Sequence, residues 1–307
     1  MRTLLICHDC APLDRDGLSR WLGSFSTFAG TVVVREDRRR RRQRIARELA
    51  RVGPLRFVDV LAFRLFYRLV QVRADRRFEA RELDRLRRMF PDPRLAPECV
   101  VSSPNSAAAA GFIRERAPDL VLARCKTILK QEIFSIPRLG TYVLHPGICP
   151  EYRNAHGCFW ARAVGDDGNV GATLLRVDRG VDTGPVFGYF HVSAPPSETH
   201  VVTQHRVVLA HLDAIRDKLL DIATGRAAAL DTSGRRTATW GQPWLTAYLK
   251  TRWRAPRRAA TPLPGCNDHP GMFRHASASL CLERGASGAS VAPLDPGLPL
   301  RGSRPER

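Results

Sequence analysis

Residues 140–156 read GTYVLHPGICPEYRNAH, and a later stretch, 171–184, reads GATLLRVDRGVDTG. The first stretch begins as a buried strand, because Thr141 to Leu144 form an apolar run with β-branched residues. The run ends at His145, and a loop with proline and glycine follows at once. The second stretch is a strand that leads into a glycine-flanked turn carrying Asp182. A histidine at a strand end and a carboxylate on a turn are suited to proton transfer.

Short apolar runs elsewhere extend this pattern, and helical segments separate them. Strands are predicted over residues 4–7, 31–34, 99–101, 119–123, 141–144, 171–177 and 184–192. Strands that alternate with helices at this spacing predict an α/β fold, Rossmann-like, with a mostly parallel twisted sheet and flanking helices. Ligands bind beyond the carboxyl ends of such strands, so His145 is expected at the mouth of the site.

The chain is expected to divide into an α/β domain over residues 1–225, an aromatic-rich extension over 226–254 and a disordered tail over 255–307. Within the domain, residues 36–90 are predicted to form a helical insertion rich in arginine. Residues 35–90 hold 19 arginines and 8 acidic residues, a net charge of +11. The simplest interpretation is amphipathic helices that pack on the core and expose their arginines. A peripheral membrane contact and an RNA-binding face remain open as alternatives.

The overall composition favours a folded protein without an obvious membrane segment. Of 307 residues 44% are hydrophobic, and no uncharged apolar stretch reaches the roughly 20 residues that span a bilayer. No signal peptide is evident, so a cytoplasmic location is expected. Only four of the 49 basic residues are lysines; the net charge of +19 permits an anionic partner without favouring nucleic acid. The spacing of Cys and His residues predicts no metal site.

An ordered series of short motifs runs through the middle of the chain. It comprises PDLVLA at 118–123, IL at 128–129, Gly140, HP at 145–146, PEYR at 150–153, GAT at 171–173 and VDTGP at 181–185. This series resembles the folate-dependent formyltransferase family, which includes glycinamide ribonucleotide, methionyl-tRNA and sugar-nucleotide formyltransferases. The resemblance covers about residues 95–225.

The resemblance implies a specific reaction centre and two substrates. In the family an acceptor amine attacks the formyl carbon of 10-formyltetrahydrofolate, beside an Asn, a His and an Asp. The family His falls on His145 and the family Asp on Asp182. Ile128 and Leu129 match positions beside the pterin, and the turn with Val181 matches the loop that closes over it. The implied function is formyl transfer to an amine of a small molecule; a tRNA acceptor is less expected, because residues 226–307 lack the strand pattern of a barrel.

One position departs from the family pattern. The family Asn lies two residues before the His, where this chain has Val143, which has no side-chain donor. Loss of one oxyanion donor costs roughly 10²–10³ in rate. Asn154 is either a replacement donor or a turn residue in a left-handed conformation. Two other functions therefore stay open: a catalytically weakened protein that acts in binding, and a hydrolase of a one-carbon donor.

Overall fold

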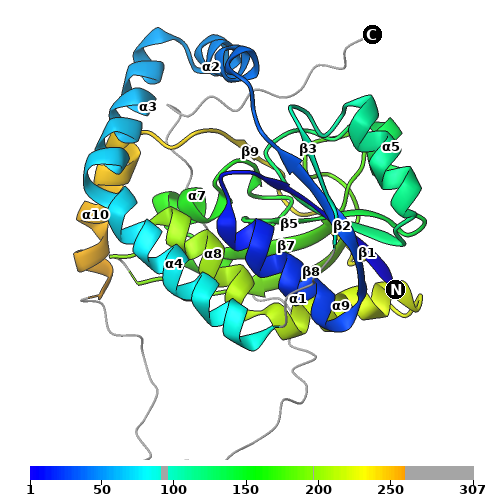
Figure 1. Ribbon diagram of the computed structural model, residues 1–307. Helices are drawn as coiled ribbons and strands as arrows, with labels where there is room; N and C mark the ends of the chain where they lie inside the picture. Colours follow the sequence, from blue (N-terminus) through cyan, green and yellow to red (C-terminus); the bar gives the residue numbers. More distant parts are fainter. Residues whose placement is uncertain (91–95, 196, 260–307) are drawn as a thin grey trace, which may run out of the picture. The chain divides into compact units, whose positions relative to one another are not determined.

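The computed structural model describes residues 1–90, 96–195 and 197–259. Met1–Pro256 form one compact unit, built around a seven-stranded sheet in the order β3-β2-β1-β4-β5-β7-β8 (Figure 1). The predicted tail begins at residue 255, but the last helix continues to Ala259. The remainder of that predicted tail, 260–307, lies outside the described residues.

Five strands of the sheet run parallel: β1 (Arg2–His8), β2 (Thr27–Val34), β3 (Glu98–Val101), β4 (Leu120–Arg124) and β5 (Gly140–His145). Strand β7 (Gly171–Arg176) is antiparallel to β5, and β8 (Val186–His191) is antiparallel to β7. The central strands are apolar almost throughout, because both faces of a parallel sheet are covered. The prediction of a mostly parallel, Rossmann-like α/β sheet is confirmed.

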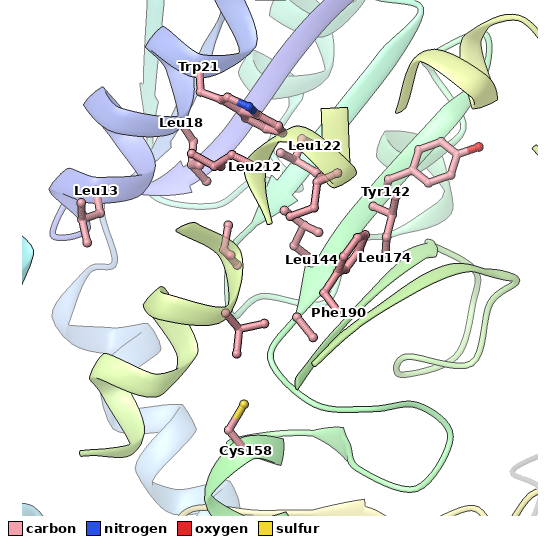
Figure 2. Close-up of a cluster of buried hydrophobic side chains, with 14 of the residues drawn as sticks. Leu13, Leu18, Trp21, Leu122, Tyr142, Leu144, Cys158, Leu174, Phe190 and Leu212 are labelled. Carbon is pink, nitrogen blue, oxygen red and sulfur yellow. The ribbon is translucent and has the colours of Figure 1, made fainter. Parts of the chain in front are cut away.

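Side chains of β1 alternate between two cores. Leu5 and Cys7 join the larger core, whereas Leu4 and Ile6 join the smaller one. The larger core is lined by α1 (Ser19–Phe25), α3 (Pro54–Phe66), α4 (Val72–Met89), α7 (Gly157–Val164), α8 (His200–Ala210) and α9 (Leu212–Ala223). Helices α5 (Ala107–Arg116) and α6 (Gln131–Phe134) cover the smaller one (Figure 1). Figure 2 shows the larger core, where leucines of neighbouring strands meet Trp21 of α1.

The predicted insertion is helical. It consists of α2 (Arg38–Val52), α3 (Pro54–Phe66), a π-helical turn over Tyr67–Gln71, and α4. Gly53, with φ of 78°, and Pro54 at the first turn of α3 separate the first two helices. None of the helices in the described part of the chain is both long and apolar enough to cross a membrane.

Residues 198–223 have an amphipathic pattern that predicts one long helix, but the structure divides them. Helices α8 and α9 are separated at His211. The backbone of His211 leaves the helical region, with φ of −121° and ψ of 21°, and its Nδ1 lies 2.8 Å from the Val207 carbonyl oxygen. A side chain that binds the last carbonyls of α8 competes with continuation of the helix.

The aromatic-rich segment packs back onto the domain. Its short strand β9 (Thr239–Trp240) pairs with β6 (Arg153–Asn154), and α10 (Leu245–Ala259) follows. The Trp240 ring stacks on Tyr152 and on Trp160, with ring centroids 5.9 Å and 4.9 Å away. These contacts hold the segment against the loop that follows β5, where the predicted site lies.

Candidate active site

His145 is the last residue of β5 and is almost fully buried. Along this strand Tyr142 and Leu144 enter the larger core, so Val143 and His145 share the opposite face. In register, Val143 lies opposite Ala123 of β4 and Leu175 of β7, and His145 lies opposite Thr173. The histidine therefore stands at the carboxyl end of the parallel strands, where the sequence places it.

Both ring nitrogens of His145 face oxygen acceptors. Nε2 lies 2.7 Å from the carbonyl oxygen of Tyr152, and Nδ1 lies 3.3 Å from Oδ2 of Asp182. A carbonyl oxygen only accepts hydrogen bonds, so Nε2 carries a proton and donates it. The contact at Nδ1 is then favourable only with one further proton, on Nδ1 or on the carboxyl group. His145 and Asp182 are thus placed to form a hydrogen bond between Nδ1 and Oδ2.

Asp182 is held in place by the backbone before α7 (Gly157–Val164). Its Oδ2 accepts a hydrogen bond of 2.8 Å from the backbone N–H of Asn154. Arg153 donates from Nη1 to the Val181 carbonyl oxygen at 3.3 Å, which ties the same turn to the same segment. Asp182 has a φ of 52°, a left-handed conformation that aspartate tolerates better than most residues. Its placement therefore depends on the turn and on the 153–154 segment together.

Asn154 has the left-handed backbone that the turn interpretation predicts, with φ of 79°. Its side-chain Nδ2 donates to the Trp240 carbonyl oxygen at 2.6 Å. The amide nitrogen is thus already engaged away from His145, and the contribution of Asn154 to the pair is its backbone N–H.

The loop after β5 closes tightly around the histidine because two positions lack a side chain. A Cβ on Gly147 would lie 2.5 Å from the Tyr152 carbonyl oxygen and 2.9 Å from Nε2 of His145, and a Cβ on Gly157 would lie 2.4 Å from Cα of Gly147. Neither distance is compatible with a larger residue. The glycines bring the Tyr152 carbonyl within reach of the imidazole.

Two residues outside the predicted site also fix this geometry. Thr173, fully buried, donates to the Gly147 carbonyl oxygen at 2.7 Å and accepts from the Cys149 N–H at 3.0 Å. Arg124, at the end of β4, donates to the Leu144 carbonyl oxygen at 2.7 Å and pairs with Asp14 at 3.1 Å. Thr173 belongs to the GAT motif and Arg124 follows the predicted fourth strand, but their roles depend on contacts across the sheet that no local pattern reveals.

Val143 lies in an apolar setting. It packs against a small cluster made by Cys149, Leu175 and Val186. It shares the face of β5 with His145 but offers no hydrogen-bond donor there. The pair is therefore flanked by a hydrophobic wall at the position where the family pattern has an amide.

The residues predicted beside the pterin lie between β4 and α6. Leu129 is buried in the smaller core, whereas the side chain of Ile128 is 61% exposed. Asn105 holds this segment, because its Nδ2 donates to the Ile128 carbonyl oxygen and its Oδ1 accepts from the Lys130 N–H, each at 2.9 Å. A further contact joins it to the turn that carries Val181: Arg179 donates to Oε1 of Gln131 at 2.9 Å. The turn thus contacts the 128–131 segment through Arg179, and it contacts His145 through Asp182.

Two other histidines form a partly buried pair near the start of α7. The rings of His156 and His200 are 5.2 Å apart, edge to face. Burial lowers the pKa of His200 from 6.5 to about 4, and the positive charges of Lys126 and Arg162 add to this effect. Burial, reinforced by His200, also lowers the pKa of His156 well below its ordinary value. Both imidazoles are therefore neutral at pH 7.

The His200 pKa makes stability depend on pH in a defined direction. Between pH 6.5 and pH 4 the unfolded chain binds a proton at His200 that the folded chain does not, so stability falls on acidification across this range. On acidification the free energy of unfolding should fall less in His200→Phe, which keeps an aromatic ring. We expect the difference to be on the order of 3 kcal/mol. Urea unfolding at pH 7 and pH 4.5 measures it, with the exposed His191→Phe as control. An unchanged pH dependence in His200→Phe would contradict the assignment.

Comparisons with known proteins give a family profile and relatives for part of the chain. Residues 93–215 match the sequence profile of the formyl transferase family. Methionyl-tRNA formyltransferase from Thermotoga maritima is 28% identical over 134 residues, which are 43% of this chain and 41% of that protein. The enzyme of the same name from Burkholderia thailandensis is 28% identical over 171 residues, covering 53% and 52%. The chain spans about half the length of these relatives.

Solved structures of the same kind are similar at low identity. A sugar N-formyltransferase from Shewanella sp FDAARGOS_354 has a TM-score of 0.48 and 14% identity, with 83% of this chain and 87% of that chain covered. Phosphoribosylglycinamide formyltransferase from Streptococcus pneumoniae TIGR4 has a TM-score of 0.46 and 16% identity, with 72% and 98% covered. The motif series lies within the matched region, and residues 93–215 form a formyl transferase domain.

Proposed function

We propose that the protein transfers a formyl group from 10-formyltetrahydrofolate to an amine of a small molecule. The observation that carries this proposal is the His145–Asp182 pair at the carboxyl end of β5, with 3.3 Å between Nδ1 and Oδ2. The carboxyl group is oriented by a backbone N–H and the imidazole by a carbonyl oxygen, so neither depends on solvent for its position. A fixed acid–base pair is what acyl transfer to an amine requires.

The folate would supply the formyl group, and the residues around Ile128 fit its flat pterin ring. The exposed side chain of Ile128 offers apolar surface beside the buried Leu129. The turn that carries Val181 contacts the same segment through Arg179 and Gln131. Ile128, Leu129 and Val181 would therefore hold the donor between a strand-end segment and a turn that also orients the catalytic carboxylate.

In the reaction, the amine nitrogen forms a bond to the formyl carbon, and the bond from that carbon to the folate nitrogen breaks. Negative charge develops on the formyl oxygen, and the amine loses a proton while the leaving nitrogen gains one. The Nε2–H of His145 can donate a hydrogen bond to that oxygen and stabilise its charge, while Asp182 holds the ring from the Nδ1 side. Because Nε2 donates to Tyr152 in the free site, contact with the formyl oxygen exchanges one acceptor for another.

Val143 sets the expected rate of this chemistry. An amide donor at this position would contribute roughly 10²–10³ to the rate. The polar groups in the cluster around Val143 are the weakly donating Cys149 thiol and the Tyr189 hydroxyl, which already donates to the Cys149 carbonyl oxygen. Formyl transfer is therefore expected to be slow, with His145 as the main source of charge neutralisation. A weakened protein that acts by binding would transfer little or no formyl group to an amine. A donor hydrolase would consume the one-carbon donor without any amine.

The acceptor is proposed to be a small amine, such as that of an amino-sugar nucleotide. Following β8, the described residues contain the helices α8–α10 and the two-residue strand β9.

Replacing the imidazole tests the proposal. His145→Ala should lower the conversion of 10-formyltetrahydrofolate to tetrahydrofolate, in the presence of a panel of small amines, by at least about 10²-fold. His191→Ala removes an exposed histidine and serves as control. Retained turnover in His145→Ala would sink the assignment. Donor consumption that needs no amine would indicate a hydrolase, and absence of folate binding by calorimetry would indicate a protein without this activity.

Restoring the amide is the complementary experiment. Val143→Asn should raise the rate of formyl transfer by roughly tenfold to a hundredfold, because it returns a donor to the face of β5 that holds His145. Val143→Ala, which opens similar space without a donor, should not raise it. Steady-state kinetics with the same amine distinguish the two. Equal losses of rate in both variants would show that the apolar wall itself is needed.

A further inference from the structure

Helix α3 carries apolar side chains on two opposite sides. Val60 and Phe63 are buried against the domain. The other side is bare, with exposed fractions of 89% for Leu55, 65% for Val58, 45% for Leu61, 59% for Leu65 and 70% for Leu69. These five residues, spaced three or four apart, lie along one side of the helix and of the π-helical turn after it. We call them the α3 face.

Such a surface is unusual for a protein that acts alone in water. A contiguous exposed apolar patch on a folded protein usually marks an interaction site. The interpretation of the insertion as helices with a purely solvated outer side does not account for five exposed aliphatic residues in one row. Something of apolar character is therefore expected to cover the α3 face.

The α3 face is presented rigidly. Asp59 accepts from the Thr246 N–H at 3.1 Å, and Gln71 donates to the Tyr248 hydroxyl at 2.7 Å, which fastens α3 to α10. Tyr248 also contacts Phe63, with ring centroids 5.5 Å apart. The two helices lie side by side in Figure 1. Binding through the α3 face would need no refolding of the insertion.

The charge around the α3 face identifies the kind of partner. Residues 35–90 carry a net charge of +11. Arg68 and Arg73, on either side of Leu69 along the chain, are exposed. On α10, Lys250 is exposed next to Leu249, whose exposed fraction is 52%. A partner that covers the α3 face must therefore offer both an apolar region for the aliphatic side chains and negative charge for the basic residues around them.

We propose that the α3 face docks on the surface of an anionic lipid bilayer. The helix would lie in the plane of the interface, with the aliphatic side chains at the boundary of headgroups and acyl chains and the arginines on lipid phosphates. A second copy of the chain fits less well, because a symmetric contact would bring two surfaces of the same strong positive charge together. The proposal goes beyond formyl transfer and does not depend on it.

Vesicle binding by the full chain tests this proposal. We expect co-sedimentation with phosphatidylcholine vesicles that contain about 30% phosphatidylglycerol, weakening with salt, and little with pure phosphatidylcholine. The double variant Leu61→Gln/Leu65→Gln should bind the anionic vesicles roughly tenfold or more weakly. The control Val100→Gln/Met89→Gln alters two equally exposed apolar residues outside the α3 face and should bind like the unaltered chain. Thermal unfolding verifies that the exposed changes leave the fold intact.

Several results would overturn it. These are no binding of the full chain to anionic vesicles, equal binding to neutral ones, or equal binding by the double variant and the unaltered chain. A dimer in analytical ultracentrifugation that the double variant dissociates would place a second copy on the α3 face instead. Binding of single-stranded RNA that requires Leu61 and Leu65, without vesicle binding, would assign it to nucleic acid. Vesicle binding that appears only after removal of residues 260–307 would make that segment the occupant of the α3 face in the full chain.

Discussion

The contact between His145 and Asp182 is the constraint on which the rest of the site depends. An imidazole with acceptors at both nitrogens needs an additional proton on one member of the pair, and the surrounding contacts keep both acceptors in place. Gly147 allows the Tyr152 carbonyl to approach, and the Asn154 N–H holds the carboxylate. Strand, loop and turn thus meet at the contact between Nδ1 of His145 and Oδ2 of Asp182.

The segment after residue 225 supports this contact from behind the loop that follows β5. The Trp240 carbonyl accepts from the side chain of Asn154, and the Trp240 ring stacks on Tyr152. Arg153 pairs through its backbone N–H with the Ala238 carbonyl oxygen at 3.1 Å. The segment that orients both members of the pair is therefore supported from the C-terminal side. A substitution at Trp240 would therefore disturb the contacts of Tyr152 and Asn154 that hold the pair.

Much of the fold could be predicted from the sequence because it rests on local pattern. Apolar runs predicted the seven strands of the sheet, and the end of one of them placed His145 at its mouth. The spacing of the motifs also led to the family. The separation of α8 from α9 at His211, the roles of Thr173 and Arg124, and the backbone contribution of Asn154 could not be predicted. Each of these depends on a partner that the fold brings close, or on a backbone angle that composition does not specify.

The most direct test of the central claim removes the charge of Asp182 and keeps its shape. In Asp182→Asn, the side-chain oxygen can still accept from the Asn154 N–H, so the turn is retained while the charge of the carboxylate is lost. The measurement is the rate of formyl transfer from labelled 10-formyltetrahydrofolate to the amine, with folate affinity determined in parallel. The account predicts a rate lower by at least about 10²-fold with folate affinity preserved. A rate within about twofold of the unaltered chain would contradict it, because the carboxylate would then contribute almost nothing to the reaction.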